Sequence, residues 1–109
     1  MDDDLVERVL TVVESIPAGQ ICSYGDIAEL LEVGPRQIGA VMSVYGAAVP
    51  WWRVTNANGE LPPHLLDDAR QHWMGEGIGL ASNGRGCRIR VHRADLSHLA
   101  QAVRDTMAP

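Results

Sequence analysis

The sequence predicts a mainly α-helical domain with one small β-hairpin, arranged as a winged helix-turn-helix. Apolar residues recur with helical spacing in several separate stretches, and two short helical stretches flank a Gly-Pro turn. An Asn-Gly pair, a strong signal for a tight hairpin, follows them where a wing would lie. With 109 residues, the chain is expected to form a single domain over residues 1–109 with a core that needs no disulfide or metal.

The first helix is predicted over residues 5–16, where apolar side chains at positions 5, 9, 12, 13 and 16 share one face. The tripeptide at residues 17–19, Pro-Ala-Gly, ends this helix because proline and glycine both disfavour a helix interior. Residues 20–22 are expected to form a short extended piece.

The second helix is predicted over residues 24–31. Ser23 is a plausible N-cap, and Asp26 three residues later completes a capping-box pattern. Gly34 is expected to close this helix, and Pro35 suits the first turn of a third helix over residues 36–44.

The third helix has two different faces. Its inward stripe consists of Ile38, Val41, Met42 and Tyr45. Its other face consists of Arg36, Gly39, Ala40 and Ser43. Such small, nearly uncharged residues suit close approach of the helix backbone to a nucleic-acid groove, although packing against another helix explains the pattern equally well.

Four further elements follow. Asn58 and Gly59 predict a hairpin, and a hairpin directly after a helix-turn-helix is typical of a wing. A helix is predicted over residues 65–74, a half-buried strand over residues 88–91 from their polar-apolar alternation, and a last helix over residues 96–107. The last helix is expected to pack through Leu96, Leu99, Ala100 and Val103.

The net charge of −5 weighs against a nucleic-acid-binding protein, but the charges are unevenly distributed. Residues 1–35 hold eight acidic residues and one Arg, whereas residues 36–109 hold eight Arg and six acidic residues. The chain contains no Lys, so its positively charged residues are all Arg. The Arg guanidinium suits paired contacts with phosphates and with the edges of nucleobases. Because affinity for DNA follows the local patch more than the total charge, DNA binding is not excluded.

Other functional classes find little support. The chain has no apolar run of about 18 residues and begins with an acidic segment, so we expect a cytoplasmic protein with no membrane span. Cys22 and Cys87 form no CxxC pair and have no His at metal-ligand spacing. We therefore expect two reduced, inert thiols, with no metal site and no cofactor.

Four ordered motifs are far more specific than the composition. They are IPAGQ at residues 16–20, SYGDIA at 23–28, GPRQIGAVM at 34–42 and VPWWRV at 49–54. Together they resemble the DNA-binding domain of the O6-alkylguanine-DNA alkyltransferases, over about residues 5–80. The resemblance implies the winged helix-turn-helix fold and a role in recognising alkylated guanine in double-stranded DNA.

One departure from the family pattern concerns catalysis. Active alkyltransferases carry Pro-Cys-His-Arg, in which the Cys thiolate accepts the alkyl group. Here Trp51 replaces the Cys and Trp52 the His that would activate it. The sequence therefore resembles the alkyltransferase-like proteins, the non-catalytic branch, which bind O6-alkylguanine and are thought to hand it to nucleotide excision repair. Two alternatives remain open: an active alkyltransferase with another nucleophile, and a winged-helix transcription regulator.

The resemblance assigns candidate residues to two surfaces. The DNA-binding residues would be Tyr24, Arg36, Gln37, Gly39, Ala40 and Ser43. The lesion pocket would contain Tyr24, Trp51, Trp52, Arg53 and His64. Arg36 matches the arginine finger, which fills the space of the flipped-out base, and Tyr24 matches the Tyr that presses on the adjacent phosphate. Trp51 would stack on the base, and Glu76 would only hold the motif in place.

Arginines late in the chain allow two interpretations. They are Arg85, Arg88, Arg90 and Arg93, and they would either contact phosphates or form a solvated face. A base-flipping protein needs no second subunit, so a monomer is expected.

Overall fold

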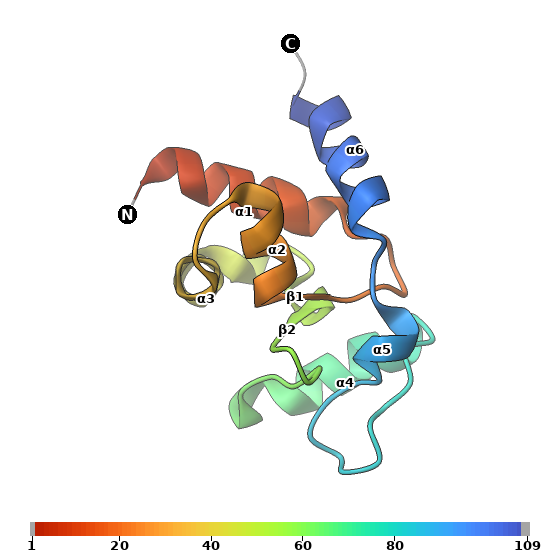
Figure 1. Cartoon of the computed structure of the whole chain (residues 1–109). Helices are drawn as coiled ribbons and strands as arrows, with labels where there is room; N and C mark the ends of the chain where they lie inside the picture. Colours follow the sequence, from red (N-terminus) through yellow and green to blue (C-terminus); the bar gives the residue numbers. More distant parts are fainter. Residues whose placement is uncertain (1, 108–109) are drawn as a thin grey trace.

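The computed structural model describes residues 2–107 and confirms the predicted fold class, mainly helical with a small sheet. The principal elements are α1 (Asp3–Ser15), β1 (Cys22–Ser23), α2 (Tyr24–Leu31), α3 (Pro35–Tyr45), β2 (Val54–Thr55), α4 (Leu66–Gly75), α5 (Ile89–His92) and α6 (Leu96–Met107). Three short 3-10 helices complete them: η1 (Gly46–Ala48), η2 (Trp51–Arg53) and η3 (Pro63–Leu65). Figure 1 shows α1, α2 and α3 grouped in one half, α4 and α5 in the other, and the two strands between them.

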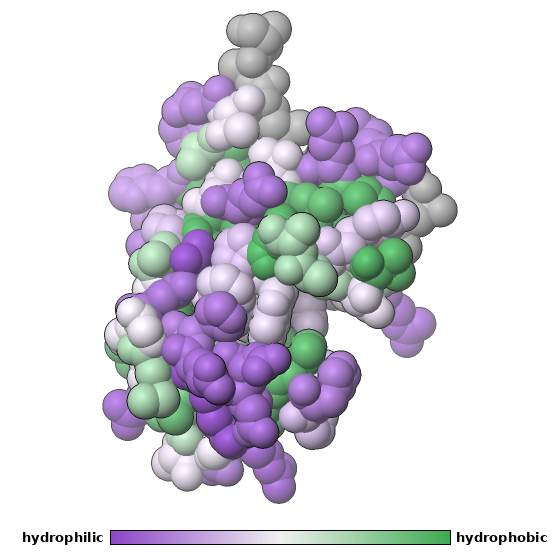
Figure 2. All heavy atoms as spheres, turned by 180° about the vertical axis from the view of Figure 1, so that it is seen from behind, coloured by the Kyte–Doolittle hydropathy of each residue, from purple (hydrophilic) through white to green (hydrophobic). Residues whose placement is uncertain are grey.

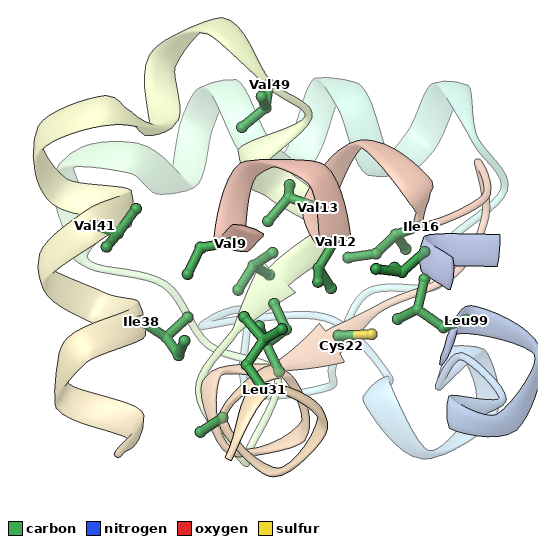
Figure 3. Close-up of a cluster of buried hydrophobic side chains, with 14 of the residues drawn as sticks. Val9, Val12, Val13, Ile16, Cys22, Leu31, Ile38, Val41, Val49 and Leu99 are labelled. Atoms are coloured by element: carbon green, nitrogen blue, oxygen red, sulfur yellow. The ribbon is translucent and has the colours of Figure 1, made fainter. Parts of the chain in front are cut away.

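The main core lies where α1, α2, α3 and α6 meet (Figure 3). The apolar stripe of α1 is buried as its spacing predicts, and α6 adds Leu99 and Val103. Its fully buried aliphatic side chains include Val9, Val12, Val13, Ile27, Ile38 and Val41. Burial of each such side chain contributes about 1.5–3 kcal/mol, so this core fixes how α2 and α3 lie against each other.

The capping box of α2 forms as predicted. The Ser23 hydroxyl accepts a hydrogen bond from the backbone N–H of Asp26 at 3.0 Å, and the Asp26 carboxylate accepts from the N–H of Ser23 at 3.0 Å. The prediction that Gly34 closes this helix is wrong. Glu32 takes the left-handed conformation at the C-cap, with φ at 59°, while Gly34 precedes α3 and Pro35 is its first residue.

The two faces of α3 differ as predicted, with one correction. Ile38 and Val41 are fully buried and Met42 is half-buried. Tyr45 does not belong to the inward stripe, because it is 43% exposed in the last turn of α3, where the helix leaves the core.

The predicted wing hairpin is wrong in its pairing. Asn58 and Gly59 do form a turn, organised by the Asn56 side chain, which accepts from the N–H groups of Asn58 and Glu60 at 2.9 and 2.8 Å. A tight type I′ hairpin needs positive φ at both central residues, and only Gly59, at 79°, has it. The turn is instead closed by hydrogen bonds from the N–H of Gly59 to the carbonyl oxygen of Asn56 and from the N–H of Asn56 to the carbonyl oxygen of Glu60, each at 3.0 Å. Beyond it, Glu60 also bridges to Gly86, and β2, which precedes the turn, pairs in parallel with β1.

The second half packs around Trp73 of α4, which is fully buried beside Leu61, Ala69 and Ile78. The predicted strand at residues 88–91 is wrong, because these residues lie mostly in the short helix α5. Ile89 is buried, but Val91 is 71% exposed, whereas a half-buried strand would bury both. No helix within residues 2–107 has the length and apolar character required to cross a membrane.

Candidate nucleic-acid interface and base pocket

A cavity of about 460 Å³ lies between α3 and the beginning of α4. In Figure 2 the outline of the molecule is indented on the side where these two helices face each other. The residues that line the cavity are Tyr24, Gly39, Met42, Ser43, Gly46, Ala47, Trp51, Val54, Leu61, Pro62, His64, Leu65 and Asp68. Five of the candidate residues therefore meet at one cavity, although they come from four separate segments of the chain.

Tyr24 and Trp51 are held by different local structures. Tyr24 is the first residue of α2, directly after the capping box, and burial raises the pKa of its hydroxyl, which stays protonated at neutral pH. Trp51 begins η2 and is half-buried. Its ring lies edge-on to Trp52, with centroids 5.7 Å apart, and edge-on to His72 at 5.9 Å. These contacts fix the indole plane that borders the cavity.

Trp52 and Arg53 do not line the cavity, contrary to the predicted pocket. Trp52 stacks face to face on His72, with ring centroids 3.5 Å apart, and its Nε1 donates to Glu76 at 2.7 Å. A 3-10 helix has about three residues per turn, so consecutive side chains point about 120° apart. Only Trp51 of this turn can therefore face the cavity. The stacking partner of Trp52, His72, lies 20 residues later in α4, and no pattern in the sequence indicated this contact.

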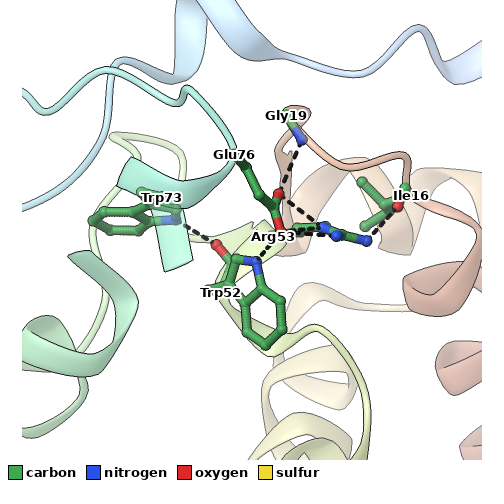
Figure 4. A network of polar contacts seen from close by, with 6 residues as sticks. All are labelled: Ile16, Gly19, Trp52, Arg53, Trp73 and Glu76. Atoms are coloured by element: carbon green, nitrogen blue, oxygen red, sulfur yellow. Dashed lines mark hydrogen bonds and ion pairs between the residues drawn. The ribbon is translucent and has the colours of Figure 1, made fainter. Parts of the chain in front are cut away.

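Glu76 joins segments of the chain that are far apart in the sequence (Figure 4). Its carboxylate accepts from Arg53 Nη2 at 2.8 Å and from the N–H of Gly19 at 2.9 Å, besides Trp52. Arg53 also donates from Nη1 to the carbonyl oxygen of Ile16 at 2.9 Å. Burial alone raises the pKa of Glu76, but the hydrogen bonds from Arg53, Gly19 and Trp52 outweigh it and hold the pKa below its ordinary value. Glu76 therefore stays ionised and holds the motif in place.

The exposed face of α3 borders the cavity mouth. Arg36 and Ala40 are exposed, and Arg36 forms no ion pair with any residue between 2 and 107. Gln37 is also exposed, but its Oε1 accepts from the N–H of Gly34 at 2.9 Å and caps the helix. A Cβ atom added at Gly39 would meet no atom within 4 Å, so the surface above this residue is open.

The late arginines do not act as one group. Arg93 Nη2 lies 2.5 Å from Asp26 Oδ1, so this residue ties the chain before α6 to the capping box of α2. Burial alone raises the pKa of Asp26, but the hydrogen bonds from Arg93 and Ser23 outweigh it and hold the pKa below its ordinary value. The carboxylate therefore stays ionised. Arg85, Arg88 and Arg90 are exposed.

Neither thiol lies at the cavity. Cys22 and Cys87 are both buried and free, and burial raises the pKa of Cys22 to about 12 and that of Cys87 to about 11. Both therefore stay protonated at neutral pH, and a protonated thiol is a poor nucleophile.

Comparison with known proteins agrees with this geometry. Residues 4–77 match the family model of the 6-O-methylguanine DNA methyltransferase DNA-binding domain. A DNA base-flipping protein of Escherichia coli (strain K12) is 33% identical over 90 residues, which is 77% of this chain and 70% of the relative. A DNA base-flipping protein of Vibrio parahaemolyticus is 32% identical over 89 residues, covering 76% of this chain and 89% of the relative.

Two solved structures share the fold. S. pombe Atl1, in complex with damaged DNA containing O6-carboxymethylguanine, aligns with a TM-score of 0.74 at 22% identity. S. pombe ATL in complex with DNA aligns with a TM-score of 0.71 at 24% identity. Each alignment covers 87% of this chain and 98% of the other. Because the family model spans more than half of the chain and the bacterial relatives are about one-third identical, the protein belongs to the family of the 6-O-methylguanine DNA methyltransferase DNA-binding domain.

Proposed function

We propose that this protein is a non-enzymatic sensor of DNA damage. It binds O6-alkylguanine in double-stranded DNA from the minor groove, flips the damaged base into the cavity beside Trp51 and leaves the alkyl group in place. One observation carries the proposal: the cavity opens next to the small-residue face of α3 and is bordered by an indole, with no thiol in its lining. The base-flipping relatives and the S. pombe complexes with DNA support it.

Docking relies on the shape of α3 rather than on a dense basic patch. Gly39, Ala40 and Ser43 have small side chains, so the helix backbone can approach the minor groove closely. Arg36, at the start of the same helix, forms no ion pair within the described part of the chain, so its guanidinium can enter the base stack and replace the extruded base. Tyr24, in the cavity lining, would press on the phosphate beside the extruded nucleotide.

The cavity has the size and character expected for a base with a substituent. Its volume falls within the range of about 300–1,000 Å³ that is common for small-molecule sites. Leu61 and Leu65 add apolar surface for an alkyl group, and Trp51 adds a stacking plane. Alkylation at O6 weakens the guanine pair, so a damaged base costs less to flip than an intact one.

Catalysis is not expected from these residues. Indole nitrogen is neither a strong nucleophile nor a base at neutral pH, so Trp51 and Trp52 replace both groups that alkyl transfer needs. Since the lesion would remain in the DNA, its removal requires a second activity. We propose that the bound complex marks the site for nucleotide excision repair proteins, as the family resemblance implies.

The test compares matched duplexes with and without one O6-methylguanine. The protein should bind the damaged duplex more tightly, and the methyl group should remain on guanine after long incubation. Appearance of unmodified guanine or of methylcysteine would favour an active alkyltransferase. Strong preference for one sequence, with no preference for the lesion, would favour a transcription regulator.

A further inference from the structure

The cavity contains one carboxylate that the proposed function does not use. Asp68 lies in the first turn of α4 and lines the cavity opposite α3. It forms no ion pair with any residue in the range 2–107. Its neighbour Asp67 differs on both counts, because it pairs with Arg70 at 3.4 Å and lies outside the lining.

No arginine compensates Asp68 within the cavity. The lining contains no Arg, and His64 is its only basic side chain. Arg53, the arginine of the nearby motif, is engaged by Glu76 and by the carbonyl oxygen of Ile16. When His64 is neutral, the cavity therefore has one net negative charge.

The position of Asp68 matches the part of the base that carries the lesion. Tyr24, Gly39 and Ser43 lie on the side of α2 and α3, from which DNA would approach, while η3 and α4 form the opposite wall with His64 and Asp68. In guanine, O6 lies on the edge of the ring system remote from the N9 bond to the sugar. A base entering from the DNA side therefore directs its O6 substituent towards the wall that carries Asp68.

We infer that Asp68 sets the charge selectivity of the pocket, an inference that rests on the proposed function. The pocket accepts neutral O6-alkyl groups and groups with hydrogen-bond donors, and it disfavours groups with a carboxylate. The entering base displaces water, which lowers the local dielectric constant and strengthens the repulsion between two negative charges. We expect a discrimination of about fivefold or more, because fivefold is the scale of the repulsion between two like charges about 4 Å apart in bulk water and the repulsion is stronger where water is displaced.

The experiment compares two lesions of nearly equal shape and different charge. Duplexes of one sequence carry O6-carboxymethylguanine, O6-carbamoylmethylguanine or unmodified guanine, and their Kd values are measured by fluorescence anisotropy for the whole protein. Asp68→Asn is the test variant. Asp67→Asn is the matched control, because it makes the same charge change one residue away on the same helix. All duplexes are measured at pH 8 and at one constant salt concentration.

The wild-type protein and Asp67→Asn should bind the carbamoylmethyl lesion about fivefold more tightly than the carboxymethyl lesion. Asp68→Asn should bring this ratio close to one. The ratio cancels any general gain in affinity for DNA that follows from losing a negative charge. An unchanged ratio in Asp68→Asn, with both lesions still preferred over guanine, overturns the inference and leaves the proposed function standing. If wild type prefers neither lesion over unmodified guanine, the proposed function itself fails.

Discussion

At the scale of single residues, the orientation of Trp51 is the decisive feature of the cavity. Its neighbours Trp52 and His72 stack together, and both rings are nearly perpendicular to the indole of Trp51, which cannot turn away without breaking two aromatic contacts. A preorganised stacking plane lowers the entropy that a flipped base must lose on binding. The aromatic cluster therefore serves recognition, although only one of its three members lines the cavity.

Trp51→Ala should lose more affinity for lesion DNA than for undamaged DNA of the same sequence. Stacking on an aromatic side chain contributes about 1–3 kcal/mol per base, and only a flipped base can use it. Binding of both duplexes at one salt concentration measures this difference. As a control, replacing the exposed Arg90 with Ala should weaken both duplexes about equally or not at all. Equal losses on the two duplexes in Trp51→Ala would show that Trp51 acts only in packing.

Arg36→Ala should weaken binding to lesion DNA by about 1–3 kcal/mol, the scale of a lost arginine contact with nucleic acid. Gln37, the other long side chain in the first turn of α3, is engaged in capping the helix, because its Oε1 accepts a hydrogen bond from the N–H of Gly34. Arg104→Ala, the control, removes the same charge from α6, where this residue donates to Gln101. If the two variants bind lesion DNA with equal affinity, Arg36 contributes charge alone and is not a finger.

At the scale of elements, α3 combines a buried face with an outer face whose small residues have no role in the core. Ile38 and Val41 anchor it against α1 and α2, and Pro35 fixes its start. Gly39 in the helix interior lowers helix stability, because glycine costs about 0.5–1 kcal/mol relative to alanine. Space for a Cβ atom exists at this position, so packing within the protein does not require the glycine.

Gly39→Ala should therefore stabilise the protein by about 0.5–1 kcal/mol and weaken binding to DNA. The added methyl group would stand between the helix backbone and the groove. Gly75→Ala, in α4, is the matched control, since its Cβ atom also meets nothing within 4 Å. Denaturant unfolding and duplex binding are measured for both variants. A Gly39→Ala protein that binds DNA as tightly as wild type would remove this face from the proposed interface.

At the scale of the whole molecule, two ionised carboxylates connect segments that are far apart in the sequence. Glu76 connects the end of α4 to η2 and to the loop after α1, and Asp26 connects α2 to Arg93 before α6. Both pKa values lie below their ordinary range. A group with a lowered pKa in the folded state stabilises the protein above its unfolded pKa, and this contribution disappears as the pH falls through the folded pKa.

Glu76→Gln should lower the free energy of unfolding at pH 7 by about 2 kcal/mol, the scale of hydrogen bonds to a charged group. The glutamine amide would place N–H donors against the donors of Arg53 and Trp52. The difference between variant and wild type should shrink below about pH 4.5, where the unfolded-state carboxyl is protonated. Urea unfolding at pH 7 and at pH 3 measures it. A difference that is equally large at both pH values would mean that the carboxylate charge contributes nothing.

The sequence by itself determined the elements with strong local signals. Helical spacing located α1 and α6, the Ser23–Asp26 pattern located the start of α2, and Pro35 that of α3. These features depend on neighbours within a few residues, so they can be predicted from a single sequence. The motif at residues 49–54 likewise identified the family, and it indicated a cavity without a catalytic Cys.

Only the tertiary structure decided which side chains face the cavity. The rotation of η2 directs Trp51 to the cavity and Trp52 to His72, and α4 brings in Asp68, which no motif marks. Residues 88–91, whose alternation predicted a strand, lie mostly in the helix α5, and Glu60 after the Asn-Gly turn bridges to the distant Gly86. These outcomes depend on pairings between residues distant in the sequence, whose free energies exceed the weak local preferences of short segments.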